Sequence, residues 1–215
     1  RVIEVERSPG GEKAIAKAAA LLSDASFPVI LNGAGTVLSG AIETSVALAE
    51  RLGAPVCCNY QHNDAFPGSH PLAAGPLGYN GSKAAMELIS RADVVLALGT
   101  RLNPFSTLPG YGIDYWPKDA RLIQVDINAD RIGLTKKVDV AIQGDARRVA
   151  EQLLTQLSVT AGDAGRAQRA DLIAKCKSDW ASELAGMDHE EDDPGTTWNQ
   201  RSRDDKPERM SPREA

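Results

Sequence analysis

The chain has 215 residues, of which 42% are hydrophobic and only 5% aromatic, and it carries a formal net charge of −5. This length allows a sizeable, mainly aliphatic core, and the negative charge argues against a nucleic acid or an anionic membrane as the main partner. No apolar run approaches the roughly 20 residues needed to span a bilayer, and the first residues show no signal-peptide pattern. Cys57, Cys58 and Cys176 form neither a disulfide framework nor a metal motif. The composition therefore predicts a cytoplasmic protein with buried thiols.

Short apolar runs alternate with helical patterns over residues 1–160, which we expect to form one domain. Helices are predicted at about residues 8–23 and from residues 39, 82 and 146 onward. Strands are predicted at residues 28–31, 56–58, 92–98, 122–125 and 138–142. Because strands alternate with helices, the sequence predicts an α/β fold with a doubly wound, mostly parallel, Rossmann-like sheet.

Four segments lie outside this alternation. Residues 59–81 and 99–119 are rich in proline and glycine, and we expect them to be ordered loops. Residues 161–187 show one apolar helical stripe and are predicted to form a helical extension. Residues 188–215 contain too few apolar residues for a core and are expected to be a linker.

Residues suited to ligand binding follow four of the predicted strands. They are Gly33-Ala34-Gly35, Arg101, Asp126-Ile127 and Gly144-Asp145. In an open parallel sheet, ligands bind beyond the carboxyl ends of the strands. The Gly33–Gly35 turn could bring backbone N–H groups to an anion, Arg101 could bind a phosphate, and Asp126 could accept hydrogen bonds from a ribose. The set predicts an ADP-like ligand, unless these are ordinary turns and Arg101 pairs with a surface carboxylate.

Two other site types are disfavoured. The NAD fingerprint is incomplete, because Leu38 stands at the third glycine position and Asn59, not an acid, follows the second strand. His62, Asp64 and His70 have no metal-binding spacing, so no metal site is predicted.

Several of these stretches resemble a known family. PVILNGAG, ADVVLALGTRL, LIQVDIN and DVAIQGDA are similar to the central domain of thiamine-diphosphate enzymes of the acetolactate synthase group. Within that group, the loops NYQHNDAFPGSHPL and TRLNPFSTLPGYGIDYWP are most similar to those of the sulfoacetaldehyde acetyltransferases. The likeness extends over nearly the whole chain.

The resemblance implies an acyltransferase that uses thiamine diphosphate and Mg²⁺ and converts the small-molecule substrates sulfoacetaldehyde and phosphate to acetyl phosphate and sulfite. In that family an N-terminal domain carries an activating glutamate, and a C-terminal domain carries a GDG motif that this chain lacks. We therefore expect a central domain without catalytic residues. It would be inactive alone, would be joined to N- and C-terminal domains, and would form a homo-oligomer (dimer or tetramer) when complete.

The resemblance also assigns positions. In relatives this domain binds the ADP part of FAD or of CoA, or keeps a vestigial pocket. The matching positions are Gly33, Ala34, Gly35, Arg101, Asp126, Ile127, Gly144 and Asp145. The loop Gly78-Tyr79-Asn80 is expected to face the active site. Two alternatives remain, namely another member such as acetolactate synthase or oxalyl-CoA decarboxylase, and a non-catalytic nucleotide-binding or assembly module.

Overall fold

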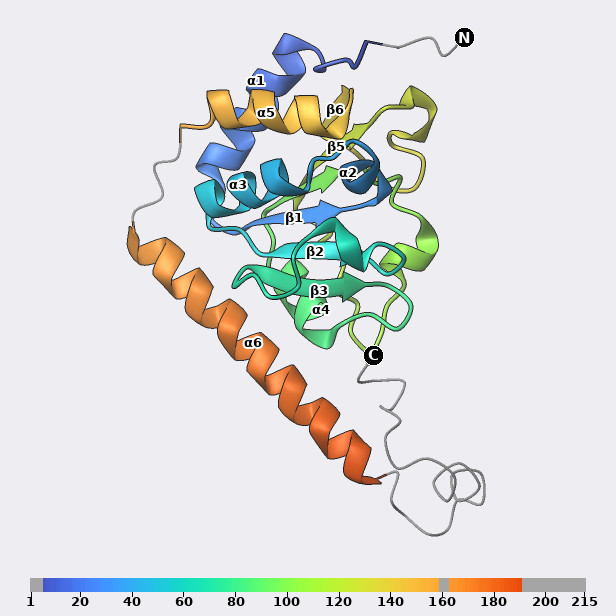
Figure 1. Ribbon diagram of the computed structural model, residues 1–215, viewed down its shortest axis with the longest axis vertical. Helices are drawn as coiled ribbons and strands as arrows, with labels where there is room; N and C mark the ends of the chain where they lie inside the picture. Colours follow the sequence, from blue (N-terminus) through green and yellow to red (C-terminus); the bar gives the residue numbers. More distant parts are fainter. Residues whose placement is uncertain (1–5, 159–162, 191–215) are drawn as a thin grey trace.

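The computed structural model describes residues 6–158 and 163–190 and contains a six-stranded parallel sheet (Figure 1). The strands are β1 (Pro28–Asn32), β2 (Val56–Asn59), β3 (Ala73–Leu77), β4 (Val94–Leu98), β5 (Arg121–Asp126) and β6 (Val140–Gln143). Their order is β3-β2-β1-β4-β5-β6, so the chain reverses its direction of winding between β1 and β4. The predicted doubly wound, parallel α/β sheet is confirmed.

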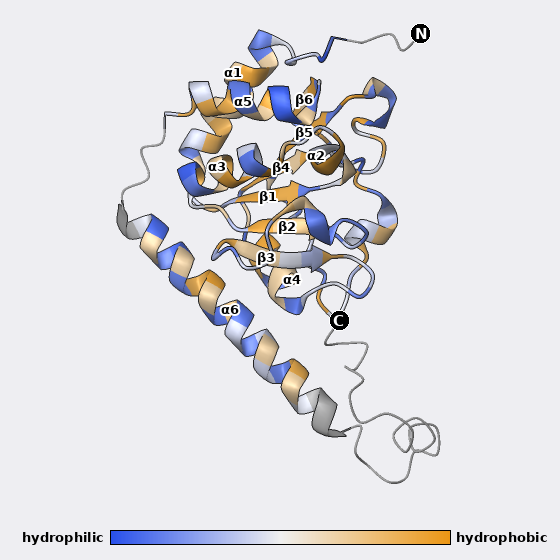
Figure 2. Cartoon of the chain, viewed as in Figure 1, coloured by the Kyte–Doolittle hydropathy of each residue, from blue (hydrophilic) through white to orange (hydrophobic). Residues whose placement is uncertain are grey.

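Helices cover both faces of the sheet, which explains why β1 and β4 are buried throughout (Figures 1 and 2). The helices α1 (Glu12–Asp24), α3 (Ile42–Leu52) and α5 (Ala146–Gln156) enclose one core, into which Ile30 of β1 points. The helices α4 (Lys83–Ile89) and α6 (Asp163–Glu190) adjoin the other core, which receives Val29 and Leu31. Successive strand residues thus serve opposite cores.

Two predicted helix starts are confirmed by their capping bonds. The Ser82 hydroxyl accepts the N–H of Ala85 at 3.3 Å and begins α4. The Asp145 carboxylate accepts the N–H groups of Arg147 and Arg148 and begins α5. In each case a short polar side chain satisfies N–H groups that the first helical turn leaves without partners.

Two parts of the secondary-structure prediction are wrong. A short helix, α2 (Ala34–Leu38), begins directly after Gly33, whereas the sequence predicted no helix before residue 39. Strand β3 lies inside the segment 59–81 that was predicted to be a loop. Gly75 and Pro76 are atypical of a strand, so the pattern did not predict it. An edge strand tolerates Pro76, because one of its sides has no ladder to donate to, and Gly75, with a φ of +103°, lies where the pairing register with β2 shifts.

The helix α6 confirms the predicted helical stretch and packs against the domain through Ile173 and Cys176. Its buried Arg169 donates to three main-chain carbonyls, those of Ser26 (2.9 Å), Leu52 (2.9 Å) and Gly53 (3.1 Å). These bonds join α6 to the end of α3 and to the turn before β1. Most of the predicted linker 188–215 lies outside the described residues. Among the described helices, none is long and apolar enough to cross a membrane.

Candidate functional site: a cavity at the carboxyl ends of the strands

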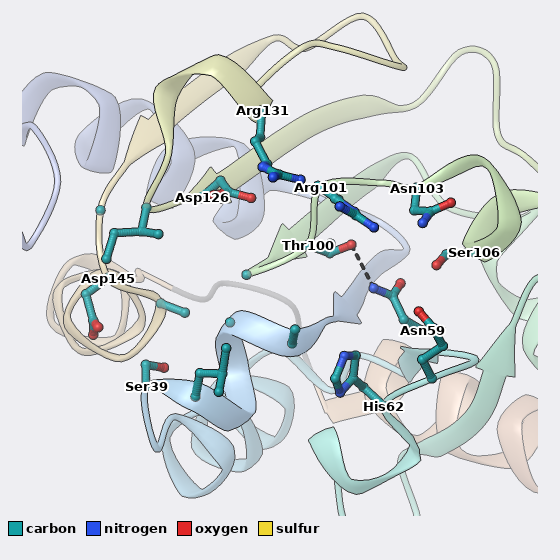
Figure 3. A pocket seen from close by; sticks show the side chains of 18 of the residues that line it. Ser39, Asn59, His62, Thr100, Arg101, Asn103, Ser106, Asp126, Arg131 and Asp145 are labelled. Atoms are coloured by element: carbon teal, nitrogen blue, oxygen red, sulfur yellow. Dashed lines mark hydrogen bonds between the residues drawn. The ribbon is translucent and has the colours of Figure 1, made fainter.

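A cavity of about 630 Å³ lies at the carboxyl ends of the strands, next to the reversal point between β1 and β4 (Figure 3). The fold brings together the predicted strand-end residues, all of which line the cavity except Gly33: Ala34, Gly35, Arg101, Asp126, Ile127, Gly144 and Asp145. The predicted loop Gly78-Tyr79-Asn80 follows β3 and does not line it. The site prediction was therefore right about which strand ends meet, and binding itself stays a prediction.

The glycines of the β1–α2 turn are required by packing. A Cβ on Gly33 would lie 2.6 Å from the Cβ of Thr100, and a Cβ on Gly35 would lie 2.7 Å from the Cα of Gly99. Gly99 itself has a φ of +62°, a conformation that few other residues adopt, and the N–H of Gly35 donates to its carbonyl at 2.8 Å. The two strand ends therefore touch backbone to backbone, which accounts for these glycines without any ligand.

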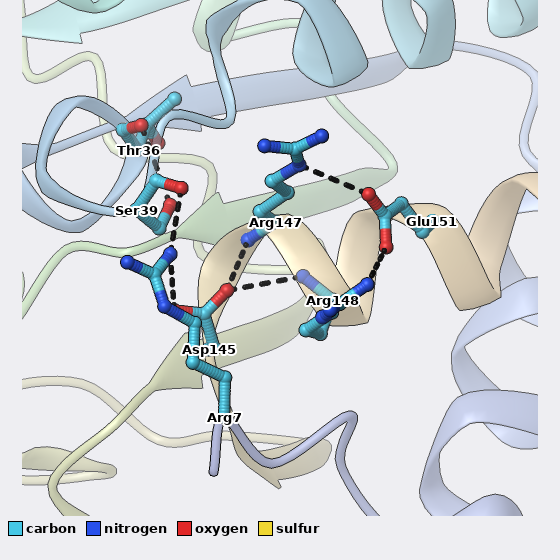
Figure 4. A network of polar contacts seen from close by, with 7 residues as sticks. All are labelled: Arg7, Thr36, Ser39, Asp145, Arg147, Arg148 and Glu151. Atoms are coloured by element: carbon cyan, nitrogen blue, oxygen red, sulfur yellow. Dashed lines mark hydrogen bonds and ion pairs between the residues drawn. The ribbon is translucent and has the colours of Figure 1, made fainter. Parts of the chain in front are cut away.

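Asp145 also has a structural task (Figure 4). One carboxylate oxygen accepts the N–H groups of Arg147 (3.1 Å) and Arg148 (3.2 Å), and the other lies 3.5 Å from Nη1 of Arg7. The same Arg7 nitrogen donates to the carbonyl of Ser39 at 2.9 Å. The positive end of α5 is thus already neutralised by a buried carboxylate. Sequence reading did not identify Arg7, because its partners lie 32 and 138 residues away along the chain.

Two guanidinium groups line the cavity without a partner. Arg101 follows β4, and Arg131 ends the short helix η3 (Ala129–Arg131) that follows β5. Within residues 6–158 and 163–190, neither side chain forms an ion pair or a hydrogen bond. The alternative in which Arg101 pairs with a surface carboxylate is therefore not supported by the described part of the chain.

Two acceptors complete the polar lining. Asp126 uses one oxygen to accept the N–H of Asn128 at 2.9 Å, which leaves its second oxygen for a ligand. Asn59 is 92% buried, its Nδ2 donates to Thr100 Oγ1 at 2.9 Å, and its Oδ1 has no partner among the described residues. A buried acceptor without a donor costs about 1–3 kcal/mol, and this oxygen is closed off from solvent. Sequence reading noted Asn59 only because it is not an acid.

The remaining lining includes two apolar side chains that are otherwise exposed to solvent. Leu38 of α2 is 81% exposed and Ile127 after β5 is 68% exposed. Apolar side chains at the mouth of a polar cavity suit the flat face of a heterocyclic base.

The metal-ligating groups and thiols in and around the cavity also bear on its chemistry. Within the described ranges, no group of three or more His, Cys, Asp or Glu residues could hold a metal ion. Cys58 lies near the site, but burial and the neighbouring Asp64 raise the pKa of its thiol to about 12, so the reactive thiolate is scarce at neutral pH.

Comparison with known proteins identifies the class. The chain belongs to the family of thiamine pyrophosphate enzyme central domains, whose family model matches residues 15–153. A crystal structure from Mycobacterium smegmatis, described as a candidate thiamin diphosphate-dependent enzyme, superposes with a TM-score of 0.62 at 25% identity. The superposition covers 75% of this chain and 31% of the Mycobacterium chain. The resemblance inferred from the sequence is confirmed.

Curated relatives narrow the likeness further. The chain is 70% identical over 215 residues to the sulfoacetaldehyde acetyltransferase of Roseovarius nubinhibens. This match covers 100% of the chain and 36% of the relative. It is 68% identical over 213 residues to the sulfoacetaldehyde acetyltransferase of Rhodobacter capsulatus, and this match covers 99% of the chain and 36% of the relative. The acetolactate synthase large subunit of Corynebacterium glutamicum is 33% identical over 173 residues, and this match covers 80% of the chain and 26% of the relative. The chain therefore spans about a third of the length of the two acetyltransferases and about a quarter of that of the acetolactate synthase subunit.

Proposed function

We propose that this chain is the central domain of a sulfoacetaldehyde acetyltransferase. The observation that carries the proposal is the 70% identity to such an enzyme over the full 215 residues, loops included, against 33% to an acetolactate synthase. The complete protein would use thiamine diphosphate and Mg²⁺ to convert sulfoacetaldehyde and phosphate to acetyl phosphate and sulfite. Because the described residues contain no candidate metal cluster, both groups would be held by the parts of the protein that the relatives have beyond this match.

The test compares the protein from the complete gene with the 215-residue chain. We expect the complete protein to release sulfite and acetyl phosphate in equal amounts, and the 215-residue chain to release neither. Sulfite release by the 215-residue chain would contradict the proposed division of tasks. Formation of acetolactate from pyruvate, without sulfite release, would favour the acetolactate synthase alternative.

We infer a second function, the binding of an ADP-like ligand in the cavity. The second oxygen of Asp126 would accept ribose hydroxyls, Arg101 would bind phosphate, and Leu38 and Ile127 would pack against the base. The ligand would be ADP itself or the ADP part of FAD or CoA.

Calorimetric titration of the chain with ADP, FAD and CoA tests this function. We expect binding of at least one of them, and about tenfold or greater weakening by Arg101→Ala, since a charge-assisted hydrogen bond contributes roughly 1.5–3 kcal/mol. A yellow preparation would identify FAD. Absence of heat with all three would show that the cavity is vestigial.

A further inference from the structure

We propose that Arg131 is a second anion-binding residue of this cavity, and that Arg131 and Arg101 together hold a diphosphate group, a task that the glycine turn does not perform. This inference rests on the proposed nucleotide binding and specifies which atoms recognise the phosphates.

The first step is that three backbone donors of the β1–α2 turn are already used. The N–H of Gly33 donates to the carbonyl of Leu98 at 3.1 Å, that of Gly35 to Gly99 at 2.8 Å, and that of Thr36 to Gly33 at 3.0 Å. The helix α2 has only five residues and adds little dipole. A phosphate at this turn would find few free donors.

The second step is that the amino end of α5 is closed. Its N–H groups at Arg147 and Arg148 are bonded to the Asp145 carboxylate, which is 5% exposed and faces Arg7 (Figure 4). An incoming phosphate would meet a carboxylate there and be repelled. Anion recognition in this cavity therefore has to come from side chains.

The third step is that one buried side chain positions both guanidinium-bearing segments. Gln124 of β5 is 1% exposed, and its Nε2 donates to the carbonyl of Thr100 at 3.1 Å and to that of Arg131 at 3.3 Å. Its Oε1 accepts the N–H of Gly133 at 2.9 Å. Because Thr100 precedes Arg101, the two arginine segments are held relative to each other, and both side chains lie along the same wall in Figure 3.

The fourth step concerns charge. A guanidinium stays protonated at any physiological pH, so two unpaired ones on one wall repel each other until an anion lies between them. The carboxylates of Asp126 and Glu6 also line the cavity, but in the described part of the chain neither is within ion-pair distance of Arg101 or Arg131. A diphosphate offers oxygens to both forks at once, which a single phosphate does less well.

The experiment measures the affinity of the 215-residue chain for ADP, AMP, adenosine and inorganic pyrophosphate by calorimetry. We expect Arg131→Gln to weaken ADP and pyrophosphate binding at least tenfold and to leave adenosine binding unchanged. The matched control is Arg148→Gln, which removes the same charge from an exposed residue that pairs with Glu151 and does not line the cavity. Arg131→Lys keeps the positive charge but loses the planar guanidinium group, so its affinity for ADP and pyrophosphate should lie between those of the wild type and Arg131→Gln.

The outcomes separate the two proposals. Wild-type ADP affinity in Arg131→Gln, or an equal loss of adenosine and ADP binding, would refute the role of Arg131. Binding of pyrophosphate that depends on Arg131, without any binding of ADP, would refute the nucleotide function and retain the anion site. Binding of neither would refute both. If Arg131→Gln does not fold by circular dichroism, the comparison of Arg131→Lys with the wild type decides in its place.

Discussion

At the scale of the residue, the glycines of the β1–α2 turn serve the packing of two strand ends next to the cavity. Gly35 lies against the backbone of Gly99, and a Cβ there would have to displace main-chain atoms. By contrast, Gly68 has no atom within 4 Å of the position its Cβ would take. The two positions therefore distinguish a glycine needed for close approach from one that is not.

We predict that Gly35→Ala destabilises the ligand-free protein by about 1–3 kcal/mol, because the methyl group overpacks a backbone contact. The control Gly68→Ala should change the free energy of unfolding by less than about 0.5 kcal/mol. Urea denaturation without nucleotide measures both. If Gly35 served only to admit a ligand, the alanine variant would keep its stability and lose only ADP affinity.

At the scale of the element, one buried arginine joins α6 to the domain in addition to the apolar contacts of Ile173 and Cys176. Burial and the neighbouring Arg166 lower the pKa of Arg169, yet it remains charged at neutral pH, and its three hydrogen bonds satisfy carbonyls at the end of α3 and before β1. The ion pair of Lys83 with Glu183 and the contact between the rings of Tyr111 and Trp180 add support further along the helix.

We predict that Arg169→Met lowers the free energy of unfolding by about 1–3 kcal/mol, since it preserves the stem but leaves three main-chain carbonyls without this donor, of which the bond to Leu52 is buried. Hydrogen exchange should then show faster exchange in residues 163–186 than in β1 and β4. Lys175→Met, which removes an exposed charge from the same helix, serves as the control. Unchanged exchange in α6 would show that the apolar contacts alone hold it.

At the scale of the whole molecule, the sequence was sufficient for the class of fold and for the meeting of four strand ends. Both follow from local signals, namely buried runs, capping residues such as Ser82 and Asp145, and the rule that parallel strands end at one edge. The strand β3 was missed because glycine and proline are rare in strands, and only the folded sheet shows that Pro76 lies on an edge strand and Gly75 at a register shift. Asn59, Arg7 and Arg131 were missed because their roles depend on contacts that form only after folding.

The loops that follow β3 and β4 leave apolar side chains on the surface. Tyr79, Phe105 and Tyr111 are 48–59% exposed, and the loops are joined by bonds from Tyr79 N–H to the carbonyl of Phe105 and from Tyr111 OH to that of Gly81. An exposed apolar surface of this kind is typical of a face that another part of a protein covers. The chain spans only about a third of the length of the acetyltransferase relatives, and the active site is expected in the parts beyond this match. The orientation of Gly78-Tyr79-Asn80 toward it therefore stays a prediction.

The backbone contact between Gly35 and Gly99 has a consequence for the history of such domains. Natural selection for a folded sheet would preserve both glycines even in a lineage that had abandoned its nucleotide, because their loss harms the scaffold first. The motif NGAG then indicates that the fold is kept, and it does not indicate whether a nucleotide is bound. The side chains of Arg101 and Arg131 form no hydrogen bond or ion pair within the described chain, so a lineage without a nucleotide would be free to replace them. Their persistence or replacement among descendants would reveal which lineages still carry a nucleotide.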